Sequence, residues 1–367
     1  MIRIGITGAD GFIGWHLRAF LHSDSDITVI PVSRQAFASP KSLQDFAGGV
    51  HAIVHLAGAN RGDERALRET NISLAEQLVT ACEKAGSRPH ILFANTTHHT
   101  VKSPYGESKR IAAEKFTAWA AKSNALFTSL ILPHVFGEGS RPFYNSAVAT
   151  FCHQLANGES PRIIEDRQLE LLHVQRLAEH ICTVIRESTG GEIRLHGAPI
   201  RVSELLSTLQ KMAVQSNEGV IPELASSLEF ELFNCFRWYL FPQRYPVPVN
   251  LTRDENGTSL QILKTLRGGH CTLFTTRPGM TRGHHYHRRK LERLLVIGGD
   301  ALIRVRRLLE HPVTEFRVSS DHPQFVDLPT LHTYDVTNIG AGDLTTLFWE
   351  QEISDPDSDD TLSLIHI

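Results

Sequence analysis

The chain has 367 residues, of which 41% are hydrophobic and 21% charged, so it is long enough for two domains with full-sized cores. Its formal net charge of −3 gives no reason to expect nucleic acid or an anionic membrane as a partner. The five cysteines form no C-x-x-C pair, which argues against a disulfide framework and a cysteine zinc site. No apolar run approaches the roughly 18 residues that cross a bilayer, and no signal-peptide pattern precedes the first strand, so a cytoplasmic protein without membrane insertion is expected.

Up to about residue 240, strand-like and helix-like segments alternate. Short β-branched or apolar runs occupy 2–7, 27–33, 51–56, 90–95 and 127–132, and the stretch 71–86 carries apolar residues at helical spacing. This alternation predicts an α/β, Rossmann-type, doubly wound parallel sheet. The proline-dense stretch FPQRYPVPVN (241–250) suits a connector, so we predict a first domain over residues 1–243 and a second over 244–367.

Beyond the connector the helical spacing disappears. Residues 244–367 contain short apolar runs separated by turn residues, with Gly298-Gly299-Asp300 as a hairpin signal. This pattern predicts an all-β domain, either an antiparallel sandwich or a barrel. The acidic run DPDSDD (355–360) is expected to be solvated.

A glycine-rich turn follows the first strand in ITGADGFIG (6–14). Glycine allows the backbone to turn tightly and to approach a pyrophosphate at the positive N-terminus of the next helix. The turn therefore predicts a dinucleotide site formed by Gly8, Asp10, Gly11, Phe12, Ile13 and Gly14.

The end of the second strand indicates which dinucleotide is bound. An acidic residue there would hold the ribose 2′-hydroxyl of NAD, but the chain has Ser33 and Arg34. A guanidinium is a good bidentate partner for a 2′-phosphate, so we expect NADPH or NADP. The alternative is that Arg34 points into solvent.

Three residues fit the chemistry of a reductase. SPYGESK (103–109) places Tyr105 and Lys109 four residues apart, on one face of a helix. A phenol needs a neighbouring cation to act as an acid or base near neutrality, and Lys109 can supply that charge while it grips the cofactor ribose. The preceding strand delivers Thr96, whose hydroxyl can hold a substrate carbonyl oxygen.

Residues 1–240 resemble the extended short-chain dehydrogenase/reductase family, whose members act on nucleotide sugars. HLAGAN (55–60) and PHVFGEG (133–139) resemble its cofactor segments, which implies cofactor contacts from Leu56, Ala57, Gly58 and Pro133. Dehydratases of this family carry an acidic pair beside the catalytic threonine, but here His98 and His99 stand at that place, which disfavours dehydration. Asn145, His153 and Arg167 are candidates for substrate contact, or ordinary surface residues.

The stretch GMTRGHHYHRRKLERLLVIGG (279–299) resembles the first motif of the cupin family. Alternate strand residues point to one face, so His285 and His287 are expected to project together, with Glu292 returning on the next strand. Two imidazoles and a carboxylate suit zinc, manganese or iron, with zinc first among them. His284 is out of phase and is expected to point away.

The second cupin motif is altered in PTLHTYDVTN (329–338). Leu331 replaces a glycine, and Tyr334 occupies the position of the fourth ligand. His332 lies two residues earlier on the same face of the strand, so His332, Tyr334 or a water could complete the site. A metal-free barrel is the alternative. The segment 254–262 resembles the first strand of cupin-class sugar 3,5-epimerases: Asp254 and Gly257 match, whereas positions 256, 259 and 261 depart.

A short-chain reductase followed by a cupin resembles the CapF/WbjC-type family of bifunctional capsular-polysaccharide and O-antigen enzymes. The resemblance implies a homodimer that makes UDP-N-acetyl-L-fucosamine precursors. The cupin would epimerise a UDP-linked 4-keto-6-deoxy-N-acetylhexosamine at C3, and the N-terminal domain would reduce its C4 ketone with NADPH to UDP-2-acetamido-2,6-dideoxy-L-talose. The alternative is a nucleotide-sugar 4-epimerase or reductase whose cupin is a non-catalytic dimerisation or sugar-binding module.

Overall fold

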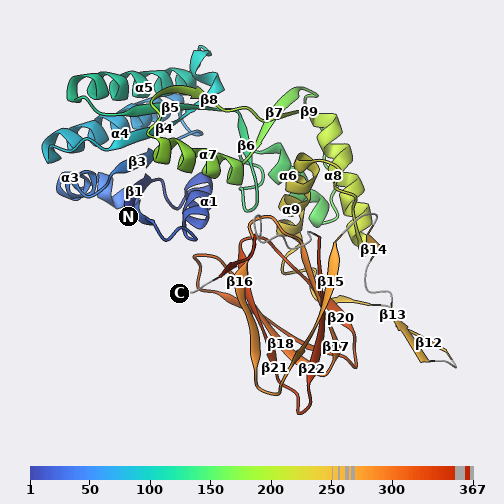
Figure 1. Ribbon diagram of the computed structural model, residues 1–367. Helices are drawn as coiled ribbons and strands as arrows, with labels where there is room; N and C mark the ends of the chain where they lie inside the picture. The colour runs from blue at the N-terminus through green and yellow to red at the C-terminus, as the bar shows by residue number, and fades with distance from the viewer. Residues whose placement is uncertain (250, 255–256, 261–263, 266–268, 352–359, 364–367) are drawn as a thin grey trace. The chain divides into compact units, whose positions relative to one another are not determined.

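The computed structural model describes residues 1–249, 251–254, 257–260, 264–265, 269–351 and 360–363 (Figure 1). The chain divides into two compact units, which are described separately. The first comprises Met1–Phe136 with Gln168–Ile200, and the second comprises Gly137–Arg167 with Arg201–Ile367. No helix in the part of the chain that is described is both long and apolar enough to span a bilayer.

The first unit contains a six-stranded sheet in the order β2-β1-β3-β4-β5-β8, and all of its neighbouring strands run parallel. The strands are β1 (Ile2–Thr7), β2 (Ile27–Val32), β3 (Ala52–His55), β4 (His90–Thr96), β5 (Phe127–Leu132) and β8 (Gly191–Arg194). A smaller sheet joins β6 (His134–Phe136), β7 (Gln168–His173) and β9 (Ala198–Arg201). The predicted parallel sheet is confirmed.

Helices cover both faces of the larger sheet. On one face, α1 (Phe12–Leu21) and α7 (Val174–Glu187) share a core with Ile4 and Ile6. On the other, α3 (Pro40–Gly48), α4 (Glu64–Ala85) and α5 (Pro104–Ser123) pack against Ile53 and Phe93. Because strands buried on both faces must be apolar throughout, the near-continuous apolar runs of the sequence follow from this layering. Two short elements, α2 (Arg34–Phe37) and η1 (Thr97–Thr100), follow strand ends.

The second unit begins with three helices, α6 (Ala147–Ala156), α8 (Val202–Asn217) and α9 (Ser227–Leu240). The short strand β10 (Val220–Ile221) lies between α8 and α9, and the strands β12 (Leu251–Asp254), β13 (Gly257–Leu260) and β14 (Lys264–Thr265) follow α9. Two five-stranded antiparallel sheets form the rest, β11-β20-β17-β22-β15 and β19-β18-β21-β16-β23. Their strands are β11 (Val247–Pro248), β15 (His270–Thr276), β16 (Thr281–Tyr286), β17 (Glu292–Gly298), β18 (Asp300–Arg307), β19 (Val313–Ser319), β20 (Gln324–Leu328), β21 (His332–Asn338), β22 (Leu344–Glu350) and β23 (Leu362–Ser363).

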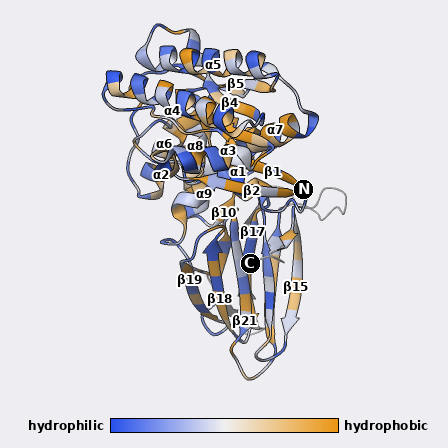
Figure 2. Cartoon of the chain, turned by 90° about the vertical axis from the view of Figure 1, so that its left-hand side faces the viewer, coloured by the Kyte–Doolittle hydropathy of each residue, from blue (hydrophilic) through white to orange (hydrophobic). Residues whose placement is uncertain are grey.

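The all-β prediction for the C-terminal part is confirmed. Hydrophobic and hydrophilic residues alternate along several of its strands (Figure 2), as expected for strands with one face toward a core. In β18 the burial alternates accordingly, with Ala301, Ile303 and Val305 buried. The fold class is therefore a Rossmann-type α/β part followed by a cupin-like β part.

The packing division does not coincide with the predicted boundary at residue 243/244. Helix α9 lies before that boundary but packs with the β-strands that follow it. Nη2 of Arg237 donates to the carbonyl oxygen of Leu328 at 2.9 Å, and Nδ2 of Asn234 donates to that of Arg289 at 3.0 Å. The limits 1–243 and 244–367 therefore remain a prediction from the sequence.

Candidate reductase site and candidate metal centre

The glycines of the 6–14 turn are required by the fold itself. Gly8 has φ +70°, and a Cβ there would lie 2.8 Å from the backbone nitrogen of Ala57. A Cβ on Gly14 would lie 2.3 Å from the carbonyl oxygen of Gly8. Helix α1 begins at Phe12, directly after Gly11, so its free backbone N–H groups stand at the turn. This arrangement can hold a pyrophosphate, with Ile13 in the first helical turn and Asp10 exposed and paired with Arg18.

Ser33 and Arg34 lie where predicted, at the end of β2. Ser33 precedes α2 and Arg34 is its first residue, and both side chains are exposed. An exposed guanidinium at this strand end suits a charge-assisted contact to a 2′-phosphate.

The segment after β3 is held by polar contacts that the sequence analysis did not single out. Oδ1 of Asn71 accepts from the backbone N–H of Ala59 at 2.7 Å, and its Nδ2 donates to Oγ of Ser108 at 3.0 Å. The backbone N–H of Ala57 donates to Oγ1 of Thr7 at 3.2 Å. These bonds fix the segment 56–58 between β1, α4 and α5. The sequence signal for these contacts was Asn71, a polar residue on an otherwise apolar face of α4.

Tyr105 and Lys109 lie in the first turns of α5, and Thr96 ends the neighbouring strand β4. Nζ of Lys109 donates to the carbonyl oxygen of Ala94 at 2.8 Å and lies 5.9 Å from the centre of the Tyr105 ring. Burial lowers the pKa of Lys109 to about 8. Burial also raises the pKa of Tyr105, opposite to the lowering expected from Lys109. The phenol therefore stays protonated near neutrality, as a proton donor must.

The hydroxyl of Thr96 is oriented by its own chain. Its oxygen accepts from the backbone N–H of His98 at 3.2 Å, so its hydrogen remains available to a ligand. Nδ1 of His99 lies 2.6 Å from the carbonyl oxygen of Thr96. Because a carbonyl only accepts, that nitrogen carries the hydrogen. The two histidines thus shape the end of β4 at the place where dehydratases carry acids.

His55 is a further residue that the sequence analysis passed over. It is buried at the end of β3, and its Nδ1 lies 2.8 Å from Oγ1 of Thr7. Burial, and secondarily the charge of Lys109, lower its pKa to about 3. His55 is therefore neutral, and Lys109 is the cation of this pair.

The three candidate substrate residues lie in the second unit on separate elements. Asn145 is exposed before α6, and Arg167 is exposed directly before β7. His153 is half-buried on α6, with its ring 5.6 Å from that of Phe143 and 6.0 Å from that of Tyr239. Tyr239 in turn donates to the carbonyl oxygen of Ser140. Their roles in substrate binding remain predictions.

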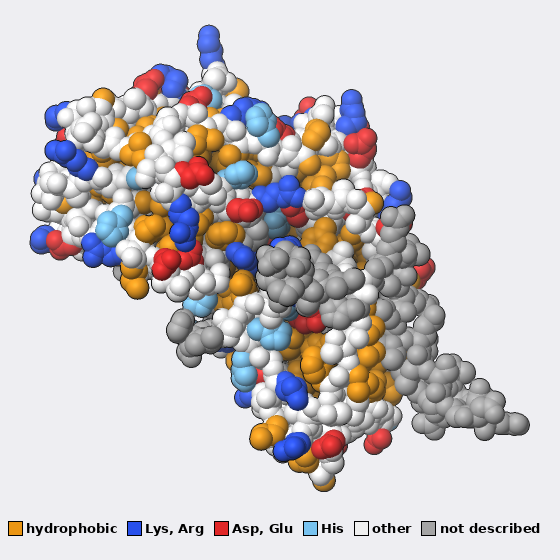
Figure 3. Space-filling model, in the orientation of Figure 1, with side chains coloured by type: hydrophobic (Ala, Val, Ile, Leu, Met, Phe, Trp, Pro, Cys, Tyr) orange, Lys and Arg blue, Asp and Glu red, His pale blue; other side chains and the backbone are white. Residues whose placement is uncertain are grey.

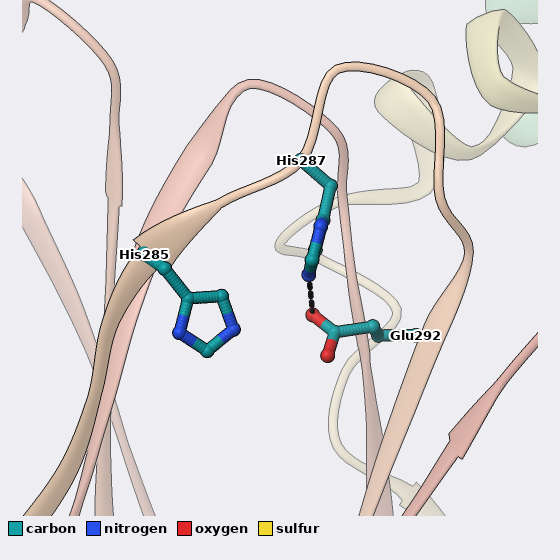
Figure 4. A group of neighbouring side chains, drawn as sticks. All are labelled: His285, His287 and Glu292. Atoms are coloured by element: carbon teal, nitrogen blue, oxygen red, sulfur yellow. Dashed lines mark ion pairs between the residues drawn. The ribbon is translucent and has the colours of Figure 1, made fainter. Parts of the chain in front are cut away.

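Among the residues described, His285, His287 and Glu292 form a group whose ligand atoms all lie within 4.8 Å of one another (Figure 4). His285 lies on β16, His287 directly follows it, and Glu292 begins β17. Tyr334 of β21 is the direct partner of His285. Its phenol oxygen lies 2.9 Å from Nε2 of His285 and donates to Oε1 of Glu292 at 3.1 Å.

A β-bulge sets the orientation of the histidines. The register of β16 against β21 shifts between Gly283 and His285. His284, inside the bulge, has φ +64° and is exposed, so it points away as predicted. Gly283 has φ +115°, and a Cβ there would lie 2.6 Å from the carbonyl oxygen of Tyr334. The bulge therefore turns His285 inward without a side chain at Gly283.

His332 lies apart from this group. Its ring centre is 5.0 Å from that of Trp238 and 5.2 Å from that of Phe241, and its Nδ1 lies 3.0 Å from the carbonyl oxygen of Thr330. Burial lowers its pKa to about 4. It shares a strand face with Tyr334, but it lies at the start of β21, where aromatic residues of α9 and the following turn cover it. Tyr334, and not His332, therefore lies beside His285 and Glu292.

The hydrogen bonds of His287 test whether the group suits a cation. Its Nδ1 lies 3.0 Å from the carbonyl oxygen of Asp360, so Nδ1 carries the hydrogen. Nε2 then faces Oε2 of Glu292 at 3.1 Å, and neither atom has a hydrogen-bond partner. Two lone pairs facing each other in a buried site require a proton or a metal ion between them. The donor set fits a divalent cation.

The pKa values of this pair agree with that requirement. Burial lowers the pKa of His287, but the neighbouring Glu292 raises it by more, so its pKa lies above the usual range. Burial raises the pKa of Glu292, but His287, together with His285 and Tyr334, lowers it by more, so its pKa lies below the usual range. With no metal bound, the pair therefore favours a proton between Nε2 of His287 and Oε2 of Glu292, the place that a metal ion would take.

One expectation about the acidic run is wrong. Asp360, its last residue, is only 2% exposed and accepts from the backbone N–H groups of Arg289 and Lys290. A carboxylate that receives two backbone donors is stabilised in a buried position. Residues 355–359, like positions 256 and 261 of the segment compared with sugar epimerases, lie outside the described residues.

Comparisons with known proteins agree with this two-part organisation. Residues 4–195 match the model of the NAD dependent epimerase/dehydratase family, and residues 252–362 match the polysaccharide biosynthesis C-terminal domain. A UDP-2-acetamido-2,6-beta-L-arabino-hexul-4-ose reductase from Pseudomonas aeruginosa is 30% identical over 98% of each chain.

Solved structures show the same likeness. The crystal structure of the capsular polysaccharide assembling protein CapF from Staphylococcus aureus is 27% identical over 99% of each chain, with a TM-score of 0.64. CapF with the inhibitor 3-isopropenyl-tropolone is 26% identical over 99% of each chain, with a TM-score of 0.59. The chain therefore belongs to the CapF/WbjC-type family, in which a domain of the NAD dependent epimerase/dehydratase family precedes a polysaccharide biosynthesis C-terminal domain.

Proposed function

We propose that this chain is an NADPH-dependent nucleotide-sugar reductase of capsular-polysaccharide or O-antigen synthesis, acting on the C4 ketone of a UDP-linked 4-keto amino sugar. The observation that carries the proposal is the placement of Thr96, Tyr105 and Lys109 at neighbouring element ends in the same unit as the glycine turn. The name of the Pseudomonas aeruginosa relative supports the substrate class.

The chain's own residues suit reduction of a ketone. The glycine turn would hold the pyrophosphate of NADPH, and Arg34 would hold its 2′-phosphate. Segment 56–58 and Pro133 would contact the remaining parts of the cofactor. Bound NADPH supplies a hydride to the carbonyl carbon. Thr96 donates a hydrogen bond to the carbonyl oxygen, and Tyr105 donates the proton that the developing alkoxide takes. Lys109, charged at neutral pH, stabilises the resulting phenolate.

For the second part, we infer a divalent metal centre, with zinc first, held by His285, His287 and Glu292, with Tyr334 at the fourth position. The unsatisfied Nε2 and Oε2 atoms of His287 and Glu292 support it. The inhibitor of CapF supports it as well, because tropolone carries adjacent carbonyl and hydroxyl oxygens that chelate cations. A bound cation would stabilise an enolate beside the C4 ketone, which suits epimerisation at C3.

The complete proposal joins both steps in one cytoplasmic homodimer. The domain over residues 244–367 epimerises the 4-keto-6-deoxy sugar at C3, and the domain over residues 1–243 reduces it to UDP-2-acetamido-2,6-dideoxy-L-talose. The second candidate is a reductase whose β domain is non-catalytic. The phenol of Tyr334 favours it, because a hydrogen-bonded Tyr334–His285–Glu292 network can also exist without metal.

Incubation with UDP-4-keto sugars and NADPH in deuterated water tests the proposal. Deuterium at C3 of a reduced product supports both steps, whereas reduction without exchange leaves the reductase and excludes the epimerase. Tyr105→Phe is expected to abolish reduction while C3 exchange continues. The His285→Ala/His287→Ala variant is expected to lose C3 exchange, and with it turnover of the starting sugar, while it still reduces a sugar supplied with C3 already epimerised. If the wild-type protein oxidises no NADPH with any UDP-4-keto sugar, the reductase assignment is wrong.

A further inference from the structure

Residues 360–363 form a short segment, here named the clasp, that lies against the metal-site strand. β23 pairs antiparallel with β16, so that Ser363 faces His285 and Leu362 faces Tyr286. β23 is the outermost strand of its sheet in the order β19-β18-β21-β16-β23. The clasp therefore adds a strand directly beside His285, the first of the proposed metal ligands along the chain.

Asp360 ties the clasp to the turn between β16 and β17. Its Oδ2 accepts from the backbone N–H groups of Arg289 at 2.7 Å and Lys290 at 3.1 Å. Its Oδ1 lies 3.7 Å from Nε of Arg288. The carboxylate thus organises three consecutive residues of the turn that separates His287 from Glu292. Such a buried, charge-assisted contact is stronger than a neutral hydrogen bond.

The same residue determines the tautomer of His287. The carbonyl oxygen of Asp360 lies 3.0 Å from Nδ1 of His287, and both residues are buried. Because the carbonyl only accepts, Nδ1 is protonated, which leaves Nε2 directed at Oε2 of Glu292 to bind either a proton or a metal ion. A backbone carbonyl in this position is the usual partner that orients a metal-binding imidazole.

The next residue secures a buried lysine beside the site. Nζ of Lys290 donates to Oγ1 of Thr361 at 3.2 Å and lies 3.4 Å from Oε2 of Glu350. Glu350 is the direct partner of Glu292 across β22 and β17. The clasp therefore contacts the surroundings of the site through three kinds of group: the backbone carbonyl of Asp360, the carboxylate of Asp360 and the hydroxyl of Thr361.

We propose that the clasp is a positioning element of the metal centre, in which Asp360 fixes the turn and holds His287 with Nε2 toward Glu292. The proposal rests on the metal centre of the proposed function and adds to it the residue that orients one ligand. Asp360 itself touches no substrate; it acts through His287.

The test uses Asp360→Ala in the full chain. Zinc affinity, measured by competition with a chelator, is expected to fall by about 10- to 100-fold. In the zinc-loaded protein, the ¹⁵N spectrum of the ring of His287, assigned by its absence in His287→Gln, is expected to change from one tautomer to a mixture. Asp360→Asn keeps one oxygen that accepts from the turn, so it is expected to recover part of the affinity.

Two controls separate positioning from general damage. Asp321→Ala removes an exposed aspartate of the same β domain and is expected to leave zinc affinity unchanged. NADPH affinity is expected to be equal in all variants. Unchanged zinc affinity and an unchanged tautomer in Asp360→Ala would overturn the proposal that the clasp positions His287. If the wild-type protein binds no zinc, the metal proposal fails, and the ¹⁵N signal of Nδ1 of His287 then decides: an equal signal in the wild-type protein and in Asp360→Ala overturns the clasp proposal.

Discussion

Tyr334 and His285 face each other across β21 and β16, with the phenol oxygen 2.9 Å from Nε2 of the imidazole. Directly opposed residues of an antiparallel pair project to the same face. Tyr334 therefore stands where the resemblance to cupins expects a fourth ligand. Burial and the Glu292 carboxylate both raise the pKa of this phenol, so it favours a hydrogen-bonding role over that of an anionic ligand.

Tyr334→His is expected to increase zinc affinity by roughly tenfold or more, because an imidazole binds zinc in its neutral form. Chelator competition measures the change. Tyr334→Phe keeps the ring and removes the oxygen, so it is the matched control and is expected to lack this gain. Equal affinity in Tyr334→His and the wild-type protein would place residue 334 outside the coordination sphere.

The pH dependence of reduction is expected to follow Lys109. Its pKa is lowered to about 8, so its charge is present below that pH and is lost as the pH rises. With saturating NADPH, kcat should decline through an apparent pKa of about 8. Tyr105 does not limit this range, because burial raises its pKa and keeps it protonated. A flat profile up to pH 10 would contradict the assigned role of the lysine charge.

Lys109→Met is expected to stabilise the fold while it abolishes reduction. The pKa falls from 10.5 to about 8, so the folded state disfavours the charged form. This penalty is fully present below about pH 8 and disappears as the pH rises to 10.5. A shift of this size corresponds to about 3 kcal/mol, an upper value for the gain in unfolding free energy at pH 7. Urea unfolding at pH 7 and at pH 10 checks it, and a gain that is larger at pH 10 would refute the explanation.

Arg34 is expected to discriminate NADPH from NADH. Arg34→Ala removes a charge-assisted contact to the 2′-phosphate, so the Kd for NADPH should rise by about 10- to 100-fold while that for NADH stays unchanged. Fluorescence titration of both cofactors measures this. Lys41→Ala, another exposed cation that follows β2, is the control. Equal losses for both cofactors would show that Arg34 does not contact the phosphate.

A buried ion pair is expected to stabilise the second unit. Nε and Nη2 of Arg293 lie 2.7 and 3.1 Å from the two carboxylate oxygens of Asp327. Asp327→Asn leaves a buried guanidinium without its counter-charge and should cost about 3–5 kcal/mol. Asp335→Asn breaks the more exposed pair with Arg304 and should cost about 1 kcal/mol or less. Urea unfolding compares them, and equal losses would contradict the role of burial.

The same pair predicts sensitivity to acid. Burial raises the pKa of Asp327, but Arg293, together with Arg237 and Tyr245, lowers it by more, so its folded pKa lies below 3.8. The resulting stabilisation is present above pH 3.8 and is lost as the pH falls through the folded pKa. Asp327→Asn should therefore unfold with less dependence on pH in this range than the wild-type protein.

Much of the candidate site could be predicted because its signals are local. Residues spaced for one helical face or one strand face remain together whatever the rest of the fold does, so Tyr105 with Lys109 and His285 with His287 followed from spacing. The glycine turn was equally local, because a side chain at Gly8 or Gly14 would collide with nearby backbone atoms.

The choice between Tyr334 and His332 needed the register and the packing. Both share one strand face, but only Tyr334 is opposite His285, while Trp238 and Phe241 cover His332. Leu331 has φ +59° and is fully buried at the position of the missing glycine. A leucine thus adopts a left-handed conformation that favours glycine, and its buried side chain offsets the backbone strain.

The sequence by itself determined the two-part fold class, the glycine turn, the Tyr105–Lys109 pair and the histidine–glutamate set, because each depends on residue types at short spacing. Only the tertiary structure decided the contacts between distant segments. It buried Asp360 against the turn after His287, placed neutral His55 near Lys109, and joined α9 to the β domain. Such contacts depend on strand register and on which surfaces meet, and no periodicity within a single element encodes them.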